Sequence, residues 1–166
     1  GLLLDPAANL DAMTQILLFC AARRDHVVAL IAPALAHGQW VLCDRFADST
    51  RAYQGAAGHI DRELVATLET AAIGETIPDL TIILDIAPEK GLARANRRRG
   101  EGSAVDAFEA SDLAFHQRVR DGYRAIAAAE PARCVVIDAD QAEAAVAAAI
   151  AKAVGERFDL RAPTQT

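Results

Sequence analysis

The chain has 166 residues, of which 52% are hydrophobic and only 5% aromatic, and its formal net charge is −6. This length and composition suit a single domain over residues 1–166 with a core of aliphatic side chains. The acidic balance argues against a general nucleic-acid or membrane-surface binder, and no apolar stretch is long enough to span a bilayer.

The first third of the chain predicts one long helix followed by a strand. Apolar residues recur near the helical period over about residues 9–37. Pro33 lacks an amide hydrogen, so it should either kink this helix or begin a second one, and Gly38 is a stop signal. The short apolar run 40–43 predicts a buried strand of a parallel sheet, and we expect the polar stretch 44–55 to form a loop.

The rest of the chain alternates helices with strands. Asp61 is a good N-cap, Gly74 lies past the end of the same helix, and Pro88 suits a helix start. Helices are therefore expected over 61–73, 88–99, 108–129 and 141–157, and strands over 80–84 and 134–137. This alternation predicts an α/β fold with a parallel sheet, whose ligands bind beyond the carboxyl ends of the strands.

The cysteines and histidines show no spacing typical of a disulfide framework or a metal site. The three cysteines lie in apolar runs and are odd in number, which predicts reduced, buried thiols in a cytoplasmic protein; they are Cys20, Cys43 and Cys134. The histidines share no metal-ligand spacing, so we expect surface or loop positions for them; they are His26, His37, His59 and His116.

The first candidate site follows the predicted strand 40–43. Asp44 and Arg45 are an acid and a guanidinium that can hold a metal and a phosphate, although a plain salt bridge would explain the pair equally well. The next residues add hydrogen-bonding and aromatic side chains able to contact a base or a sugar, namely Ser49, Thr50, Tyr53 and Gln54. These neighbours favour a ligand site.

Two further patterns each admit two interpretations. Phe19 and Arg23 share one helix face, so the ring can stack on a flat ligand while the guanidinium donates to it. Taken alone, this pair is better explained as a core phenylalanine beside a solvated arginine. A basic cluster runs into the glycine-flanked stretch 100–105 and predicts either a lid over phosphate or a solvated helix end. Its members are Arg94, Arg97, Arg98 and Arg99.

Together, these motifs resemble thymidylate kinases of the bacterial type. The matching stretches are LLLD, LLFCAARRDHV, IxPALxxGxWVLxDRF, STRAYQG, PDLTIILDIAPEKGLAR and FHQRVRDGY. The spacing from DRF to STRAYQG is the specific part. The resemblance implies a three-layer P-loop kinase fold with a parallel sheet, phosphoryl transfer from ATP with Mg²⁺ to dTMP, a cytoplasmic location and a homodimer.

The resemblance also implies a role for each site residue. Arg45 would contact the phosphate of dTMP, and Asp44 would help to organise Mg²⁺. Phe19 would stack on thymine, and Arg23 would reach an exocyclic oxygen of the base. The ring of Tyr53 would lie beside the sugar, where it crowds a 2′-hydroxyl and favours deoxyribose.

The remaining implied roles concern the base and a lid. Thr50 would hydrogen-bond the base, with Ser49 adjacent and Gln54 over the same site. A lid at about residues 94–109 would neutralise charge that moves between the two nucleotides. The arginines implied for this work are Arg97, Arg98 and Arg99.

The chain departs from the family pattern in three places. Gln15 stands where the family usually has glutamate, and Ala107 stands where the lid usually has arginine. The family also opens with a strand and a Gly-Lys-Thr loop that grips ATP, and neither motif occurs in these residues. We therefore expect a chain incomplete at its N-terminus, missing its first, central strand and ATP loop, that keeps the dTMP side but is inactive alone.

Two other functions stay open at this point. Another nucleoside or nucleotide kinase would use the same sheet with a different base. A non-catalytic nucleotide-binding or dimerising remnant would keep the binding residues without the chemistry. The pair Phe19 and Arg23, combined with Thr50, Tyr53 and Gln54, favours thymidylate.

Overall fold

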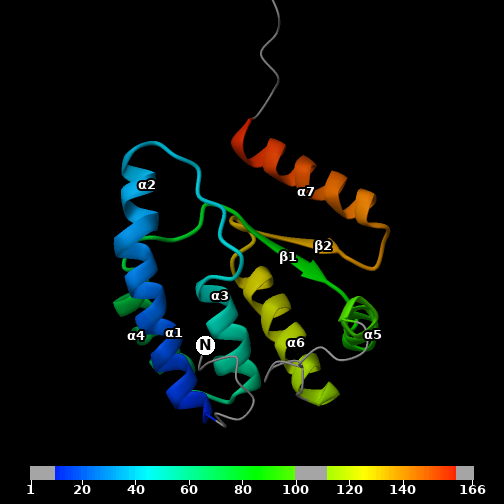
Figure 1. Ribbon diagram of the computed structural model, residues 1–166, viewed down its shortest axis with the longest axis horizontal. Coiled ribbons are helices and arrows are strands. Elements are labelled where there is room, and N and C mark those ends of the chain that lie inside the picture. Colours follow the sequence, from blue (N-terminus) through cyan, green and yellow to red (C-terminus); the bar gives the residue numbers. More distant parts are fainter. Residues whose placement is uncertain (1–9, 100–111, 160–166) are drawn as a thin grey trace, which may run out of the picture.

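A computed structural model describes residues 10–99 and 112–159, apart from the side chains of residues 98 and 99 (Figure 1). Within these ranges the sheet has two parallel strands, β1 (Thr81–Asp85) and β2 (Cys134–Asp138). They pair in register from Thr81 opposite Cys134 to Asp85 opposite Asp138. The two strands predicted in this half of the chain are therefore confirmed.

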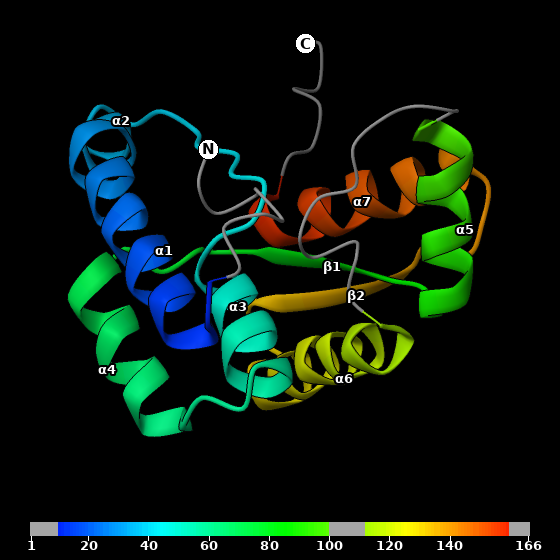
Figure 2. The same ribbon diagram turned by 60° about the horizontal axis from the view of Figure 1, so that its bottom comes forward.

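Helices cover both faces of this sheet. Between the strands the chain forms α5 (Pro88–Arg99) and α6 (Leu113–Ala129), and α7 (Glu143–Phe158) follows β2. Figures 1 and 2 show α6 and α7 on opposite sides of the strands. The face toward α6 is closed by a small buried cluster of Ile83, Ala127 and Cys134. The α/β arrangement predicted from the alternating pattern is confirmed.

The first helical segment is one rod with a widened section. It comprises α1 (Ala12–His26), the π-helical η3 (Val27–Ile31) and α2 (Ala32–Ala36), and Figure 1 shows it as a continuous column. Pro33 lies in the first turn of α2, where its missing amide hydrogen is tolerated. A widened turn just before a proline also avoids the clash of its ring with the preceding turn.

The end signals of the helices act as the sequence predicts. The Asp61 carboxylate accepts hydrogen bonds of 3.0 Å from the backbone N–H groups of Glu63 and Leu64, which begins α4 (Arg62–Ile73). Gly74 ends this helix with φ of 57°, a left-handed value that glycine adopts without strain. The rod and α4 pack around the largest core cluster, whose buried members are Ile16, Cys20, Val27, Ile31, Ala47, Val65, Ala72 and Ile73.

The strand predicted over residues 40–43 is wrong. These residues are not part of the described sheet, whose ladder pairs only β1 with β2. Trp40 is 67% exposed, although its ring meets the edge of Phe158, and Leu42 is fully exposed. An apolar run becomes a strand only where a neighbouring strand satisfies its backbone, and the described residues place none beside this segment.

The prediction of a loop over residues 44–55 is also wrong for most of that stretch. The chain turns helical at α3 (Ala47–Thr50) and continues through a second π-helical segment, η4 (Arg51–Ala57). Ala52 of η4 is fully buried against α6, where Gly122 lets the two helices approach closely. Packing of small residues, which no polar pattern reveals, therefore makes this segment helical.

The described residues bear on three further expectations from the sequence. No helix within residues 10–99 and 112–159 is long and apolar enough to cross a membrane. The three cysteines are free thiols, with Cys20 and Cys134 buried and Cys43 half-buried. Helix 108–129 begins at Leu113 in the structure, and residues 108–111 lie outside the described ranges.

Candidate active site

The segment α3–η4 presents different side chains on different faces. Residues four apart share a helix face, so Ser49 lies with Tyr53 and Thr50 with Gln54. The first pair meets α6 and Arg45, and the second meets α1. The stretch STRAYQG therefore lies between α1 and α6 and contacts both.

Arg23 links α1 to the beginning of α3. Its guanidinium donates hydrogen bonds to Thr50 Oγ1 at 2.9 Å and to the carbonyl of Phe46 at 3.0 Å. It also lies 5.6 Å from the centre of the Phe46 ring, and burial lowers its pKa. A guanidinium has five N–H donors, so these two bonds orient Arg23 and leave donors for a ligand. The contact brings together two residues that the sequence analysis assigned separately to the base, and their roles toward a ligand stay predictions.

Arg45 is held in an unusual conformation over an aromatic ring. Its φ of 64° lies in the left-handed region, which residues with a Cβ rarely adopt. The guanidinium lies 4.9 Å from the centre of the Tyr53 ring and donates a 3.1 Å hydrogen bond to its hydroxyl. The Arg45 side chain is otherwise exposed. Such strain persists only where surrounding contacts enforce it, and it concentrates at functional sites.

Tyr123 completes an aromatic cluster that sequence reasoning missed. Tyr53 meets the edges of Phe115 and Tyr123, with ring centres 6.1 and 6.4 Å apart, respectively. The hydroxyls of Tyr123 and Ser49 share a 2.8 Å hydrogen bond. Burial raises the pKa of Tyr123, so the phenol is neutral at pH 7. The available signal was the stretch FHQRVRDGY, in which Phe115 and Tyr123 lie two turns apart on one helix face.

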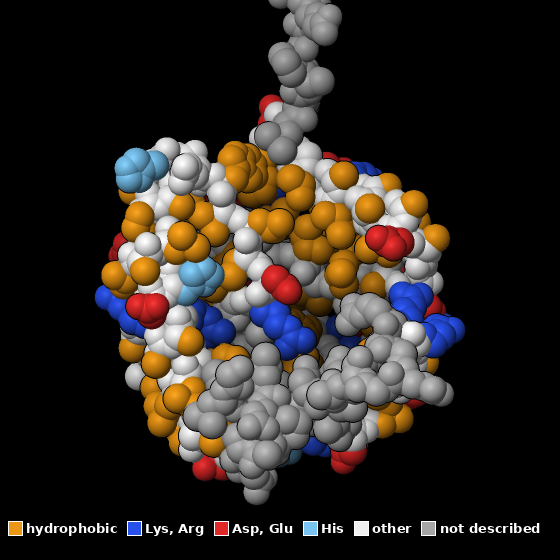
Figure 3. All heavy atoms as spheres, in the orientation of Figure 1, with side chains coloured by type: hydrophobic (Ala, Val, Ile, Leu, Met, Phe, Trp, Pro, Cys, Tyr) orange, Lys and Arg blue, Asp and Glu red, His pale blue; other side chains and the backbone are white. Residues whose placement is uncertain are grey.

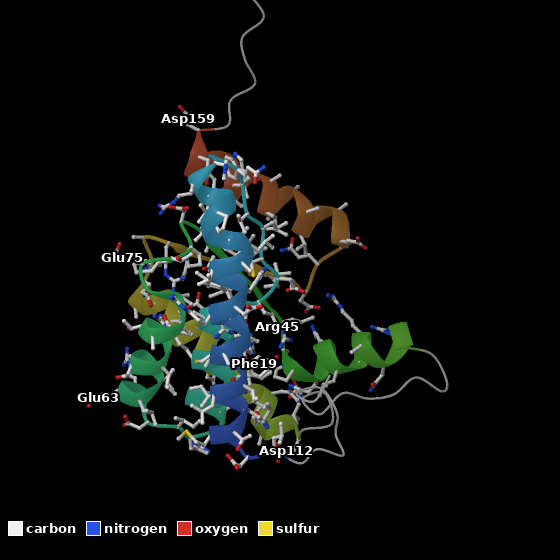
Figure 4. All side chains as sticks on the ribbon, turned by 60° about the vertical axis from the view of Figure 1, so that its left-hand side comes forward. Phe19, Arg45, Glu63, Glu75, Asp112 and Asp159 are labelled. Atoms are coloured by element: carbon white, nitrogen blue, oxygen red, sulfur yellow. The ribbon has the colours of Figure 1, made fainter. Side chains whose placement is uncertain are left out.

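Gln54 and Phe19 mark the side of the site toward α1. Gln54 is buried and donates a 3.1 Å hydrogen bond to Gln15, which in turn donates to the carbonyl of Leu10. Phe19 is half-buried one turn before Arg23. Figure 4 shows Phe19 and Arg45 close together in projection, on the side from which α5 extends.

The remaining predicted site residues are exposed or have side chains outside the described residues. Asp44 is exposed, and the described residues hold no group of three histidine, cysteine or acidic side chains suited to a metal ion. Arg97 is exposed near the end of α5, while the side chains of Arg98 and Arg99 and the stretch 100–109 lie outside the described residues.

Arg94 does not belong to a free basic cluster. It donates to the carbonyl of Ala139 at 2.6 Å and pairs with Asp140 at 3.3 Å, and Lys90 pairs with the same carboxylate. These contacts fix α5 to the turn after β2. Arg94 is therefore engaged by acceptors distant in sequence, while the lid at about residues 94–109 stays a prediction.

The face shown in Figure 3 carries both charged and hydrophobic side chains. Lys and Arg side chains lie across its middle, and hydrophobic side chains gather on the side of α7. Several large apolar residues remain exposed on the rod, namely Met13, Leu17, Val28, Leu30 and Leu35.

Comparison with known proteins places this geometry in context. The sequence profile of the family described as "Thymidylate kinase" matches residues 1–150. The chain is 56% identical over 148 residues to a thymidylate kinase from Nitrobacter winogradskyi, covering 89% of this chain and 64% of the relative. It is 54% identical over 148 residues to one from Caulobacter vibrioides, covering 89% and 69%, respectively.

A solved structure shows the same fold. The crystal structure of thymidylate kinase from Ehrlichia chaffeensis matches with a TM-score of 0.66 and 34% sequence identity, covering 88% of this chain and 66% of that one. This likeness confirms the P-loop kinase fold. The chain spans 64% of the length of each of two Nitrobacter relatives that it matches.

Proposed function

The chain belongs to the thymidylate kinase family, and on that premise we propose that the full-length protein transfers the γ-phosphoryl group of MgATP to dTMP. Full-length protein here means these 166 residues with any segment that the gene encodes beside them. The products are dTDP and ADP. The observation that carries the proposal is the convergence of Arg23, Arg45, Thr50 and Tyr53 on one segment.

The base is recognised on the side toward α1. Phe19 offers a ring for stacking on thymine, and Arg23 offers its remaining N–H donors to an exocyclic oxygen. Thr50 is buried and already accepts from Arg23, so its own hydroxyl hydrogen is available to the base. Gln54 is held over the same region by Gln15, which replaces the glutamate usual in the family.

The phosphate and sugar are recognised on the side toward α6. Arg45 is always charged and lies at the surface, and its stacking on Tyr53 fixes where the charge points. In phosphoryl transfer the protein supplies mainly positioning and charge neutralisation, which suits a preoriented guanidinium. The same Tyr53 ring, packed against Phe115 and Tyr123, is rigid enough to exclude a 2′-hydroxyl.

The site suits a Mg²⁺ ion that is bound mainly by substrate phosphates and water, with few protein ligands. Magnesium in kinases uses one or two carboxylates together with waters and substrate phosphates. The exposed carboxylate of Asp44, next to Arg45, is suited to hold water ligands of such an ion. When bound, the ion neutralises charge on the transferred phosphoryl group.

The donor side requires parts that the 166 residues do not contain. We propose that a Gly-rich phosphate loop and a central strand come from sequence outside this segment, as the relatives' greater length permits. Arg97, Arg98 and Arg99 at the end of α5 then act as lid arginines within about residues 94–109. We also propose a cytoplasmic homodimer, supported by the exposed apolar residues of the α1–α2 rod.

Two alternatives make different predictions for the same assay. A kinase for another base would phosphorylate dCMP, dGMP or dAMP faster than dTMP. A remnant would bind dTMP without any transfer. The stacking and guanidinium pair of Phe19 and Arg23 favours dTMP, because a pyrimidine with exocyclic oxygens matches an aromatic face and N–H donors.

The test is ADP release by the full-length protein with each nucleoside monophosphate in turn. We expect dTMP to be the preferred acceptor and Arg45→Ala to lower kcat/KM for dTMP by about 30- to 1000-fold. Arg24→Ala removes an exposed arginine from α1 and is the matched control, with no expected change. A loss below about tenfold in Arg45→Ala, or preference for another monophosphate, would refute the proposal.

A further inference from the structure

A cluster of five charged residues lies behind the segment that carries the proposed site. We name it the charge cluster, and its members are Asp48, Arg51, Glu69, Glu130 and Arg133. Arg133 donates to both carboxylate oxygens of Asp48, at 2.7 and 2.8 Å. Burial alone would raise the pKa of Asp48, but the hydrogen bond and charge of Arg133 lower it below its usual value.

Arg51 makes a second fork of the same kind. It donates to the two carboxylate oxygens of Glu69 on α4, each at 2.6 Å, and to Glu130 at 2.5 Å. Glu130, at the end of α6, also accepts from Arg133 at 2.7 Å and so joins the two forks. Bidentate guanidinium–carboxylate pairs fix orientation as well as distance. The cluster therefore ties α3–η4 to α4, α6 and the sheet.

The cluster meets the sheet at the start of its strands. Thr81, the first residue of β1, accepts from Arg133 at 2.7 Å and donates to Asp48 at 3.2 Å. Arg133 directly precedes β2. The cluster thus lies at the amino ends of the strands, whereas ligands of parallel sheets bind beyond the carboxyl ends.

The helix geometry connects this cluster to the proposed site. Asp48 and Arg51 are three residues apart and share a helix face, while Ser49 and Thr50 stand between them in sequence. Holding residues 48 and 51 from outside therefore sets the rotation of the segment about its axis. That rotation decides whether the Thr50 hydroxyl meets Arg23 and the Ser49 hydroxyl meets Tyr123.

We propose that Arg133 and Asp48 are positioning residues, which hold the Ser49–Gln54 segment in the orientation that binds the monophosphate nucleotide. This inference rests on the proposed function for the identity of that nucleotide. Neither residue touches the substrate in this scheme. Their effect is therefore specific to the monophosphate and leaves the ATP side unchanged.

The kinetic test uses three variants of the full-length protein. Arg133→Met and Asp48→Asn break the fork, and Arg133→Lys keeps the charge but not the bidentate geometry. We expect KM for dTMP to rise at least about tenfold in the first two variants, by an intermediate factor in Arg133→Lys, and KM for ATP to change less than about twofold. Ile137→Val trims a buried side chain of β2 outside the charge cluster and controls for lost stability.

A second measurement is independent of catalysis. Hydrogen exchange of the amides in residues 49–57 should accelerate at least about tenfold in Arg133→Met, while amides of α7 keep their wild-type rates. If Arg133→Met does not fold, Asp48→Asn and Arg133→Lys supply the same comparison. The expected pattern is faster exchange confined to this segment together with the selective rise in KM.

The outcomes separate this inference from the proposed function. If the wild-type protein does not phosphorylate dTMP, the proposed function fails, and hydrogen exchange alone decides whether the cluster positions the segment. If KM for dTMP and KM for ATP rise together, or only as much as in Ile137→Val, the positioning role is refuted. Unchanged exchange in residues 49–57 refutes it as well.

Discussion

Gly122 is the residue at which the packing of α6 on η4 can be tested most directly. A Cβ at this position would lie 2.9 Å from the Cβ of Ala56 and 3.3 Å from the Cα of Ala52. Neither atom belongs to a flexible side chain, so Gly122→Ala must push the helices apart. Overpacking of this kind costs about 1–3 kcal/mol, while alanine improves helix propensity by about 0.5–1 kcal/mol. We expect a net loss of about 0–2.5 kcal/mol in the free energy of unfolding, with a middle value of about 1 kcal/mol.

Gly155 supplies a matched control for this substitution. It lies inside α7, and a Cβ built on it meets no atom within 4 Å. Gly155→Ala should therefore raise the free energy of unfolding by about 0.5–1 kcal/mol. Urea denaturation of the two variants and the wild type, followed by circular dichroism, measures both changes.

The difference in stability between the two variants tests whether α6 and η4 are closely packed at Gly122. Equal stabilisation by both alanines would refute close packing at Gly122, because only helix propensity would then act. A loss in Gly122→Ala should also raise KM for dTMP, since Tyr123 is the next residue and contacts Ser49. A destabilised variant with unchanged KM would show that the position of Tyr123 does not matter for binding.

Three further predictions concern the site and its support. Arg45→Gly should be more stable than Arg45→Ala by about 1 kcal/mol in urea denaturation, because glycine adopts a φ of 64° freely; equal stabilities would contradict strain there. Tyr53→Phe should keep most of the preference for dTMP over ribothymidine monophosphate in kcat/KM, while Tyr53→Ala should lower it by about 10- to 100-fold; collapse in the phenylalanine variant would assign the discrimination to the hydroxyl. The pKa of Asp48 is lowered in the folded state, so its contribution to stability is present above about pH 4 and is lost as the pH falls through the folded pKa. Asp48→Asn should therefore flatten the acid limb of the stability curve, and an unchanged slope in acid titration would contradict this.

Local signals were sufficient for the elements whose ends are fixed by backbone chemistry. Asp61, Gly74 and Pro88 mark helix ends because capping and the missing amide of proline act within a few residues. The strands at residues 81–85 and 134–138 are short runs rich in β-branched residues, and they pair with each other. The run 40–43 is also short and apolar, but a strand needs a neighbour as well, which sequence pattern does not supply.

The site was predictable where its chemistry is concentrated in one motif. Arg45 contacts Tyr53, and Arg23 reaches Thr50 from the preceding helix, so candidate residues named from the sequence lie together, although these contacts were not themselves predicted. Tyr123 was missed because its partner Ser49 lies 74 residues away in sequence. The helical form of residues 47–57 depends on packing against α6, so the polar composition of this stretch wrongly predicted a loop.

The charge cluster was invisible to sequence reasoning for a related reason. Charged residues are ordinarily solvated, and nothing local distinguishes Asp48 or Glu69 from surface acids. Arg94 is the opposite case, since the sequence grouped it with a basic cluster but the structure pairs it with Ala139 and Asp140. In both cases the chain brings the partners together only after it folds.

The long reach of the Asp48–Arg133 contact has a consequence for how the protein is made. The two residues are 85 positions apart in sequence. At about 5–20 residues per second, a ribosome needs about 4–17 s to add that stretch. During this interval α3–η4 has been made but its partner has not, so this segment reaches its final orientation only after Arg133 has been added. Earlier nascent chains would expose this segment to chaperones and proteases.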